Sequence, residues 1–211
     1  MDNLIYMLFI SVFVPILLMA CLIEKKARLP IVFVLIGIFI SVFAAEVNGL
    51  LCAILPMSIF EVTIIVTPIT EELLKALPIL VFAIALDAKK EALFTAAMSV
   101  GIGFAVLENA YYLLNDASFN MIDALFRAFG AGLMHGMCTL LVGVGVSFAK
   151  KRSKIFVVGT FALLSTAITY HGIYNMLVQS DYRTVGFLLP ISTYIPFVVW
   201  RMNKKKTIKS K

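Results

Sequence analysis

Several side chains that can accept, donate or relay protons interrupt long apolar stretches of this sequence. They are Glu71, Glu72, Lys75, Glu108, His135, His171 and Asn175. Carboxylates and imidazoles are common general acids and bases, and amide or ammonium groups stabilise negative charge that develops beside them. The same side chain types also bind divalent metals and form proton paths. Their occurrence in apolar sequence predicts a polar site inside the protein.

The spacing of Glu71, Glu72 and Lys75 predicts that only one of the two carboxylates forms an ion pair with the lysine. On a helix, Glu71 and Lys75 are four residues apart with the acid on the N-terminal side, which is the better orientation for an ion pair. Glu72 reaches Lys75 three residues on, but it points about 100° away from Glu71. One acid can therefore pair with the lysine while the other stays reactive. His171 and Asn175, again four residues apart, project from one face of a later helix.

The elements that must position these groups are membrane helices. Hydrophobic residues make up 62% of the chain and charged residues only 14%, and the apolar residues come in long blocks. A transmembrane helix needs roughly 20 apolar residues, so the pattern predicts an all-α polytopic membrane protein, a bundle of about seven transmembrane helices. The predicted spans are Leu4–Ile23, Pro30–Ala45, Met57–Leu86, Ala92–Leu114, Ile122–Ala149, Ile155–Val178 and Val185–Trp200. We expect one membrane-embedded domain over residues 1–211; the second and third spans have the least sharply marked ends.

Basic residues gather in every second connection between the predicted spans. Most of the 18 lysines and arginines lie in residues 25–28, 89–90, 150–154 and 201–211. The positive-inside rule then places the N-terminus outside and the C-terminus in the cytoplasm. Because membrane topology accounts for the net charge of +6, we expect the lipid bilayer as a partner and no nucleic acid.

The charged residues within the spans have to avoid lipid. Each ionised group near mid-bilayer costs roughly 2.5 to 3.5 kcal/mol on insertion scales, so together they would forfeit on the order of ten kcal/mol against hydrocarbon. We therefore expect them to face the bundle interior and to converge with the two histidines. Pro68, just before the carboxylates, removes a backbone donor and predicts a kink in the third span.

Motifs on four successive spans resemble a known family. They are EELLK (Glu71–Lys75), GIGFAVLENAYYL (Gly101–Leu113), GAGLMHG (Gly130–Gly136) and HGIYN (His171–Asn175). In this order they resemble the PrsW family of bacterial intramembrane proteases, which is related to the CAAX-protease and bacteriocin-processing superfamily. The resemblance covers residues 67–178, which we expect to be the motif-bearing catalytic core. It implies a glutamic-type intramembrane endopeptidase without a cofactor, a multi-pass protein of the bacterial cell membrane.

The resemblance also implies a substrate and a base. The substrate is a single-span membrane protein such as an anti-sigma factor, whose first, site-1 cleavage starts stress signalling. By the family pattern Glu71 is the base that activates water, and Glu72 pairs with Lys75. The CAAX relatives carry EExxxR, whereas this chain places Lys75 one position earlier than their arginine.

The remaining motif residues receive roles in the same way. His135 or Glu108 positions the attacking water, and His171 with Asn175 donates to the oxyanion. The CAAX relatives carry FxxxH, whereas this chain has Glu108 in place of that histidine. Arg127, near the outer end of its predicted span, is expected to matter less.

Three other interpretations remain open from the residues alone. Glu108, His135 and His171 could hold zinc in a metal-dependent membrane protease, although the sequence has no HExxH motif. The Glu and His side chains could instead form the path of a proton- or ion-coupled transporter, although we detect no paired repeats. Finally, the Glu–Lys pair could simply lock two helices together.

Overall fold

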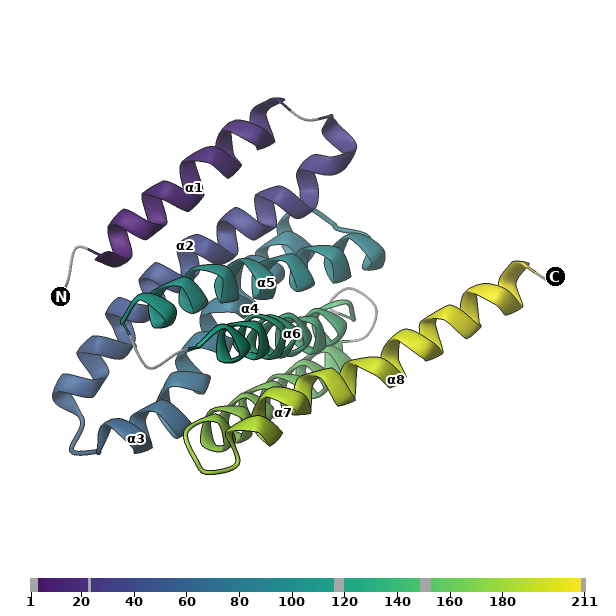
Figure 1. The fold of residues 1–211 in the computed structure, drawn as a ribbon. Coiled ribbons are helices and arrows are strands. Elements are labelled where there is room, and N and C mark those ends of the chain that lie inside the picture. The colour runs from purple at the N-terminus through teal and green to yellow at the C-terminus, as the bar shows by residue number, and fades with distance from the viewer. Residues whose placement is uncertain (1–3, 23, 116–119, 149–152, 210–211) are drawn as a thin grey trace.

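The structure, a computed structural model, describes residues 4–22, 24–115, 120–148 and 153–209, and every regular element in these ranges is a helix (Figure 1). The elements are α1 (Leu4–Leu22), α2 (Lys25–Ile54), α3 (Ile59–Glu61), the π-helix η1 (Val62–Val66), α4 (Thr67–Ala85), α5 (Lys90–Asn115), α6 (Met121–Val146), α7 (Ser153–Val178) and α8 (Arg183–Lys209). The predicted all-α polytopic membrane fold is therefore confirmed.

The long helices follow the predicted spans, although α2 and α8 extend well beyond the predicted ends. Among the described residues, the helices long and apolar enough to cross a membrane are Ala27–Ile54, Lys90–Asn115, Met121–Val146 and Phe156–Val178. The second span was predicted too short, because α2 continues through the polar residues that follow Ala45. The predicted span ends Ile23 and Ala149 lie outside the described residues.

The third predicted span is divided where Pro68 follows a π-helix. In η1 the amide of Thr67 donates to the carbonyl of Val62, five residues earlier. Pro68, the next residue, has no amide hydrogen, so the carbonyls that precede it lose a donor. A π-helix is a common local answer to such a break in the α-helical ladder. The predicted kink is thus realised as one π-helical segment immediately before the carboxylates of α4.

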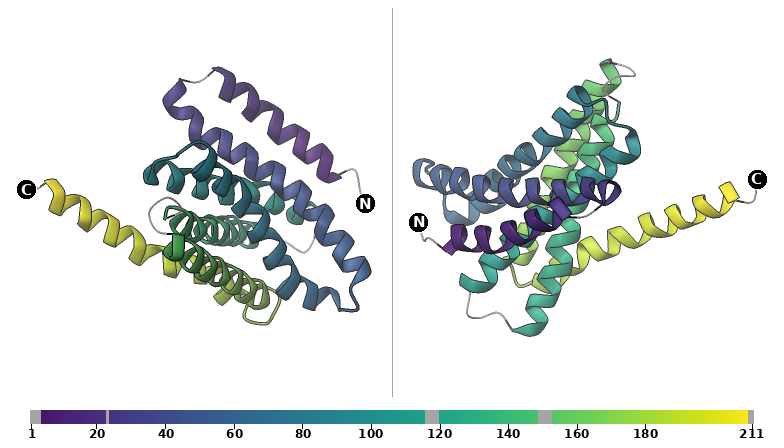
Figure 2. Two further views of the ribbon diagram at one scale, coloured as in Figure 1. Left: turned by 180° about the vertical axis from the view of Figure 1, so that it is seen from behind. Right: turned by 90° about the horizontal axis from the view of Figure 1, so that it is seen from above.

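Close helix packing places α5 at the middle of the bundle, between α2 and α6 (Figures 1 and 2). A Cβ added at Gly103 would lie 2.1 Å from the carbonyl oxygen of Val34 on α2. A Cβ added at Gly101 would lie 2.3 Å from the carbonyl oxygen of His135 on α6. These two glycines let the backbones approach, as small residues do between membrane helices. The contact at Gly101 fixes the position of His135, a predicted site residue, along α5.

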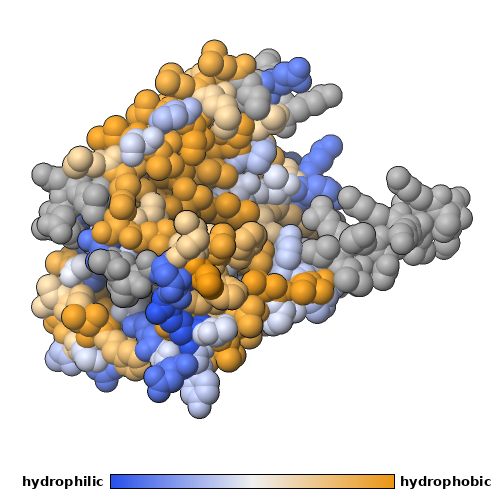
Figure 3. Space-filling view, viewed as in Figure 1, coloured by the Kyte–Doolittle hydropathy of each residue, from blue (hydrophilic) through white to orange (hydrophobic). Residues whose placement is uncertain are grey.

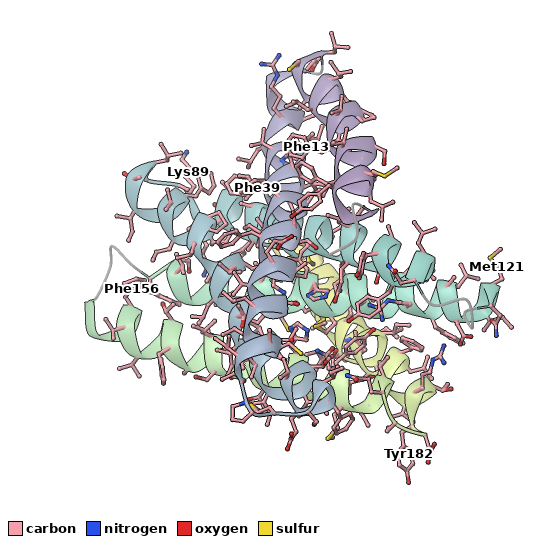
Figure 4. The ribbon with its side chains drawn as sticks, turned by 90° about the vertical axis from the view of Figure 1, so that its left-hand side faces the viewer. Phe13, Phe39, Lys89, Met121, Phe156 and Tyr182 are labelled. Atoms are coloured by element: carbon pink, nitrogen blue, oxygen red, sulfur yellow. The ribbon has the colours of Figure 1, made fainter. Side chains whose placement is uncertain are left out.

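The charged face of α4 points inward and its apolar face points outward. Leu73 and Leu77 are 47% and 56% exposed, whereas Glu72 and Lys75 are fully buried. Figure 3 shows a largely hydrophobic surface over one side of the molecule, with a hydrophilic patch at lower centre and other hydrophilic residues toward the right. Figure 4 shows apolar side chains extending outward from the helices, with Phe13 and Phe39 beside α1 and α2. This distribution suits a protein surrounded by lipid, with polar groups kept inside.

Candidate active site

The buried face of α4 carries an ion pair at its centre. Lys75 Nζ donates a hydrogen bond to Glu72 Oε1 at 2.6 Å, and both side chains have no exposed surface. The lysine therefore pairs with the second glutamate, as the family pattern implies. Helix spacing by itself favoured Glu71 for this pair. Because Lys75 pairs with Glu72, Glu71 has no ammonium group bonded to it among the residues that the structure describes, although Glu71 is only 4% exposed.

His135 of α6 connects the lysine to Glu108 of α5. Lys75 Nζ lies 2.8 Å from His135 Nδ1, and His135 Nε2 lies 2.8 Å from Glu108 Oε2. An ammonium group only donates, so Nδ1 accepts and Nε2 carries the hydrogen that is donated to Glu108. The ammonium also lies 4.5 Å from the ring centroid of Phe104. Both ring nitrogens of His135 are thus engaged, and its orientation is fixed.

His171 of α7 has one engaged and one available nitrogen. Its Nδ1 lies 2.9 Å from Glu72 Oε1. The ionised Glu72 carboxylate only accepts, so His171 Nδ1 carries the hydrogen and Nε2 presents a lone pair. His171 Nε2 lies 3.9 Å from Glu71 Oε2, which is too long for a direct hydrogen bond. The carboxylate–imidazole pair therefore aims His171 Nε2 at Glu71.

Glu71 is held by one oxygen and open at the other. Asn48 Nδ2 of α2 donates to Glu71 Oε1 at 3.2 Å. Glu71 Oε2 is buried and accepts no hydrogen bond from any residue that the structure describes. Two acceptor atoms, Glu71 Oε2 and His171 Nε2, thus face each other without a donor between them. A buried acceptor without a donor is unfavourable, so this gap suits a water molecule or a cation.

Two hollows meet at this cluster. The larger, of about 410 Å³, includes Glu46, Asn48 and Glu71 in its lining. The smaller, of about 240 Å³, includes Arg127, His135 and Asn175. Both hollows share Ile59, Thr63, Glu108 and Tyr112. A peptide segment that occupies the two hollows would therefore pass Glu108 and reach groups on both sides of it.

Asn175 forms a hydrogen bond to the backbone of η1 that the sequence did not predict. Its Nδ2 donates to the carbonyl oxygen of Thr63 in η1 at 3.0 Å. Pro68 and the π-helical bond of Thr67 leave that carbonyl without its usual backbone donor, so the Asn175 amide replaces it. One amide hydrogen of Asn175 serves α7–η1 packing. The other amide hydrogen makes no hydrogen bond within the described part of the chain, and the side chain borders the smaller hollow.

A possible metal ligand set differs from the predicted one in its carboxylate. Glu71, His135 and His171 each place a ligand atom within 4.8 Å of the other two. The predicted set contained Glu108, which instead accepts the hydrogen bond of His135. Two histidines and one glutamate suit a catalytic zinc, and Glu71 Oε2 has no hydrogen-bond donor within the described part of the chain that would block it. The lone pair of His135 is bonded to Lys75, so that ligand fits only if the lysine moves away.

Three residues near the cluster were missed or undervalued in the sequence. Asn48 holds Glu71, but it follows the predicted end of the second span and therefore resembled a loop residue. Arg127 is 7% exposed, and its guanidinium lies 4.0 Å from Glu108 and 3.9 Å from the ring centroid of Tyr112. Tyr174 stands inside the HGIYN motif but was not singled out. Asn48 could have been predicted only by extending the second span beyond Ala45, which would have placed it within a helix.

A helical membrane bundle with buried carboxylates and imidazoles beside two adjacent hollows has the arrangement of a membrane-embedded hydrolase. Residues 25–201 match the family described as PrsW family intramembrane metalloprotease, and the chain belongs to that family. It is an intramembrane protease and a multi-pass protein of the bacterial membrane. The chain matches no curated protein and no solved structure.

Proposed function

We propose that the chain is a glutamic-type endopeptidase in which Glu71 is the general base. The observation that carries the proposal is the pair of facing acceptors, Glu71 Oε2 and His171 Nε2, which lie 3.9 Å apart on two buried side chains. Of the two, Glu71 Oε2 accepts no hydrogen bond from the described residues. A water between them can donate one hydrogen to each. Such a water is oriented with its lone pairs away from both acceptors, toward a carbonyl carbon that enters from the hollows.

The chemical steps follow from these positions. The water oxygen attacks the scissile carbonyl carbon while its proton passes to Glu71. The C–N bond then breaks, and the proton held by Glu71 goes to the leaving amine. The products are a carboxyl group and an amine, so the base is regenerated without any other reactant. Asn175 would donate its second amide hydrogen to the developing oxyanion. His171, which the resemblance also made an oxyanion donor, would instead accept a hydrogen from the water, because its own ring hydrogen is on Nδ1.

The other buried groups position the reacting ones. Glu72 holds His171 through Nδ1, so that Nε2 faces the water. Lys75 binds both Glu72 and His135, and Glu108 fixes the second nitrogen of His135. The charged network therefore connects α4, α5, α6 and α7. Preorganisation of this kind lowers the cost of bringing the reactants into alignment.

A metal-dependent reaction is the second candidate, and the Glu71–His135–His171 cluster favours it. These three residues would hold the ion, and the family description agrees with that reading. A bound zinc would act as a Lewis acid that activates water and polarises the scissile carbonyl. Glu72 would then support the cluster as the partner of His171 Nδ1. The ammonium of Lys75, bonded to His135, favours the acid–base candidate because it repels a cation.

We propose a single-span membrane protein, such as a membrane-anchored anti-sigma factor, as the substrate. The ordered motifs support this class by resemblance. The site residues are buried inside the helical bundle, so a substrate that already lies in the bilayer could reach them directly from the membrane. The family assignment favours this reaction over an ion path.

Co-expression with candidate single-span anti-sigma factors tests the substrate. The wild-type protein should convert one candidate to a shorter form, whereas the Glu71→Ala variant should leave it uncut. Immunoblots with tags at both ends of the candidate would separate cleavage from loss of expression. Cleavage of that candidate by the Glu71→Ala variant would contradict the proposal.

A further inference from the structure

We propose that the smaller hollow is a subsite for a carboxylate of the substrate, bound by Arg127 and Tyr174. The inference rests on the proposed peptidase function and adds a specificity to it. An acidic side chain beside the scissile bond, on one side only, is the substrate feature that this subsite recognises.

Arg127 is a buried cation with unused hydrogen-bonding capacity. Its Nε is inaccessible and has no hydrogen-bond partner within the described part of the chain. The nearest carboxylate oxygen, Glu108 Oε1, is 4.0 Å from an Arg127 Nη atom, at the limit of an ion pair and beyond hydrogen-bonding distance. The stacked ring of Tyr112 supports the guanidinium plane but accepts no conventional hydrogen bond. The Arg127 donors therefore lack an acceptor of matching strength.

Tyr174 supplies a second unused donor to the same hollow. The residue is 2% exposed, and its hydroxyl has no hydrogen-bond partner among residues 4–22, 24–115, 120–148 and 153–209. Tyr174 on α7 and Arg127 on α6 both line the hollow of about 240 Å³. A carboxylate has two oxygens that can accept from two donors at once, and a guanidinium matches its planar geometry. The two orphaned donors thus predict an anionic ligand of carboxylate type.

The neighbouring hollow restricts this ligand to one side of the scissile bond. Glu46 and Glu71 line the larger hollow only, where their charge disfavours a second acidic group. Glu108 lines both hollows, whereas Arg127 lines only the smaller one. A bound peptide would therefore meet carboxylates along one part of its length and a guanidinium with a hydroxyl along the other. The charge that lines the site therefore differs between the two parts of a bound peptide.

A purely supporting role for Arg127 makes a different prediction. If Arg127 acted only on Glu108, its loss would disturb His135 and slow cleavage of acidic and neutral substrates by the same factor. If Arg127 binds the substrate carboxylate, its loss removes the difference between those substrates. The ratio of affinities for paired peptides therefore separates the two roles.

The experiment uses full-length protein in detergent micelles with the Glu71→Gln substitution, so that bound peptides are not cut. The probes are synthetic single-span peptides that differ only in Glu, Gln or Lys at one scanned position near the outer end of the span. Fluorescence anisotropy gives each dissociation constant. At one position we expect the Glu peptide to bind about 10- to 100-fold more tightly than the Gln peptide, as for hydrogen bonds to a charged group.

The variants then assign the preference to the two residues. Arg127→Gln should abolish it, Tyr174→Phe should reduce it while keeping the ring, and Arg127→Glu should transfer it to the Lys peptide. Arg183→Gln, which changes a partly exposed arginine at the start of α8, is the matched control and should leave the Glu preference unchanged. Absence of any Glu preference, or a preference that survives Arg127→Gln, would overturn the subsite.

Cleavage of the same peptides by protein with native Glu71 separates this inference from the proposed function. Peptides that are cut without regard to the scanned charge would refute the subsite and leave the peptidase intact. Peptides that bind through Arg127 but are never cut would refute the proposed peptidase chemistry and leave the subsite.

Discussion

Replacing Glu72 by glutamine would remove one negative charge from the centre of the bundle while keeping the shape of the side chain. The substituted amide oxygen can still accept from His171 Nδ1, so the packing of α7 is retained. Lys75, with no exposed surface, would lose the carboxylate that lies 2.6 Å from its Nζ. Removing one partner of a buried ion pair costs about 3 to 5 kcal/mol, because the remaining charge stays desolvated. We expect Glu72→Gln to lower the free energy of unfolding by this amount.

Removing both charges should restore much of that loss. In the Glu72→Gln, Lys75→Met double variant no unpaired charge remains, and replacement of a complete buried pair by apolar groups is often neutral or stabilising. The double variant should therefore be more stable than either single variant. Its activity should nevertheless stay low, because His135 loses the donor to Nδ1 and His171 loses its charged partner.

Unfolding of purified protein in mixed micelles by a denaturing detergent, followed by circular dichroism, measures these free energies. Arg183→Gln is the matched control, since its ion pair with Asp123 at 3.1 Å is partly exposed and such pairs contribute about 0.2 to 1 kcal/mol. A Glu72→Gln variant no less stable than this control, or a double variant less stable than both single variants, would refute the buried-pair reasoning.

The remaining predictions concern a positioning residue, a cofactor and topology. Asn48→Ala should lower kcat of the purified protein about 10- to 100-fold, because it removes a hydrogen bond to a charged base, whereas unchanged kcat would remove Asn48 from the site. A strong chelator should leave most of the peptidase activity, and complete loss that zinc restores would instead support the ligand set built on Glu71. In a cysteine-free background, a cysteine at Ser180 should react with an impermeant reagent from outside and one at Ala88 only from the cytosol. Labelling of the Ala88 position in intact cells would reverse the predicted orientation.

The convergence of the charged residues was predictable, because the physics of the bilayer leaves little choice. Ionised groups in a span must face protein, so Glu72, Lys75 and Glu108 had to meet partners inside the bundle. The two histidines were expected to converge with them, and each has a ring nitrogen within 3 Å of a carboxylate oxygen. Helix spacing did not identify the glutamate that pairs with Lys75, since one residue of rotation decides it; the family pattern implied the Glu72–Lys75 pair that the structure has.

The parts that the sequence did not predict depend on exact helix ends and on local backbone geometry. Asn48 could be placed only by knowing that α2 continues past the predicted end of its span. The π-helix before Pro68 creates an acceptor at Thr63, and that acceptor redirects one hydrogen of Asn175. The donors of Arg127 and Tyr174 lack partners because neighbouring helices bury them without offering an acceptor, and this depends on the three-dimensional packing. Residue type predicted a buried polar cluster, but packing determined which contacts each residue makes.

The rate of peptide-bond cleavage by the Glu71→Gln variant tests the central claim most directly. The substitution keeps the hydrogen bond from Asn48 to one side-chain oxygen and removes the proton acceptor that faces His171 Nε2. With a purified single-span substrate in micelles, and with folding checked by circular dichroism, kcat should fall by about a hundredfold or more, as for loss of a general base. Normal cleavage by Glu71→Gln, with Glu72→Gln inactive, would reverse the assignment of the base. Normal cleavage by both variants, and by His135→Ala and His171→Ala, would contradict the proposed site altogether.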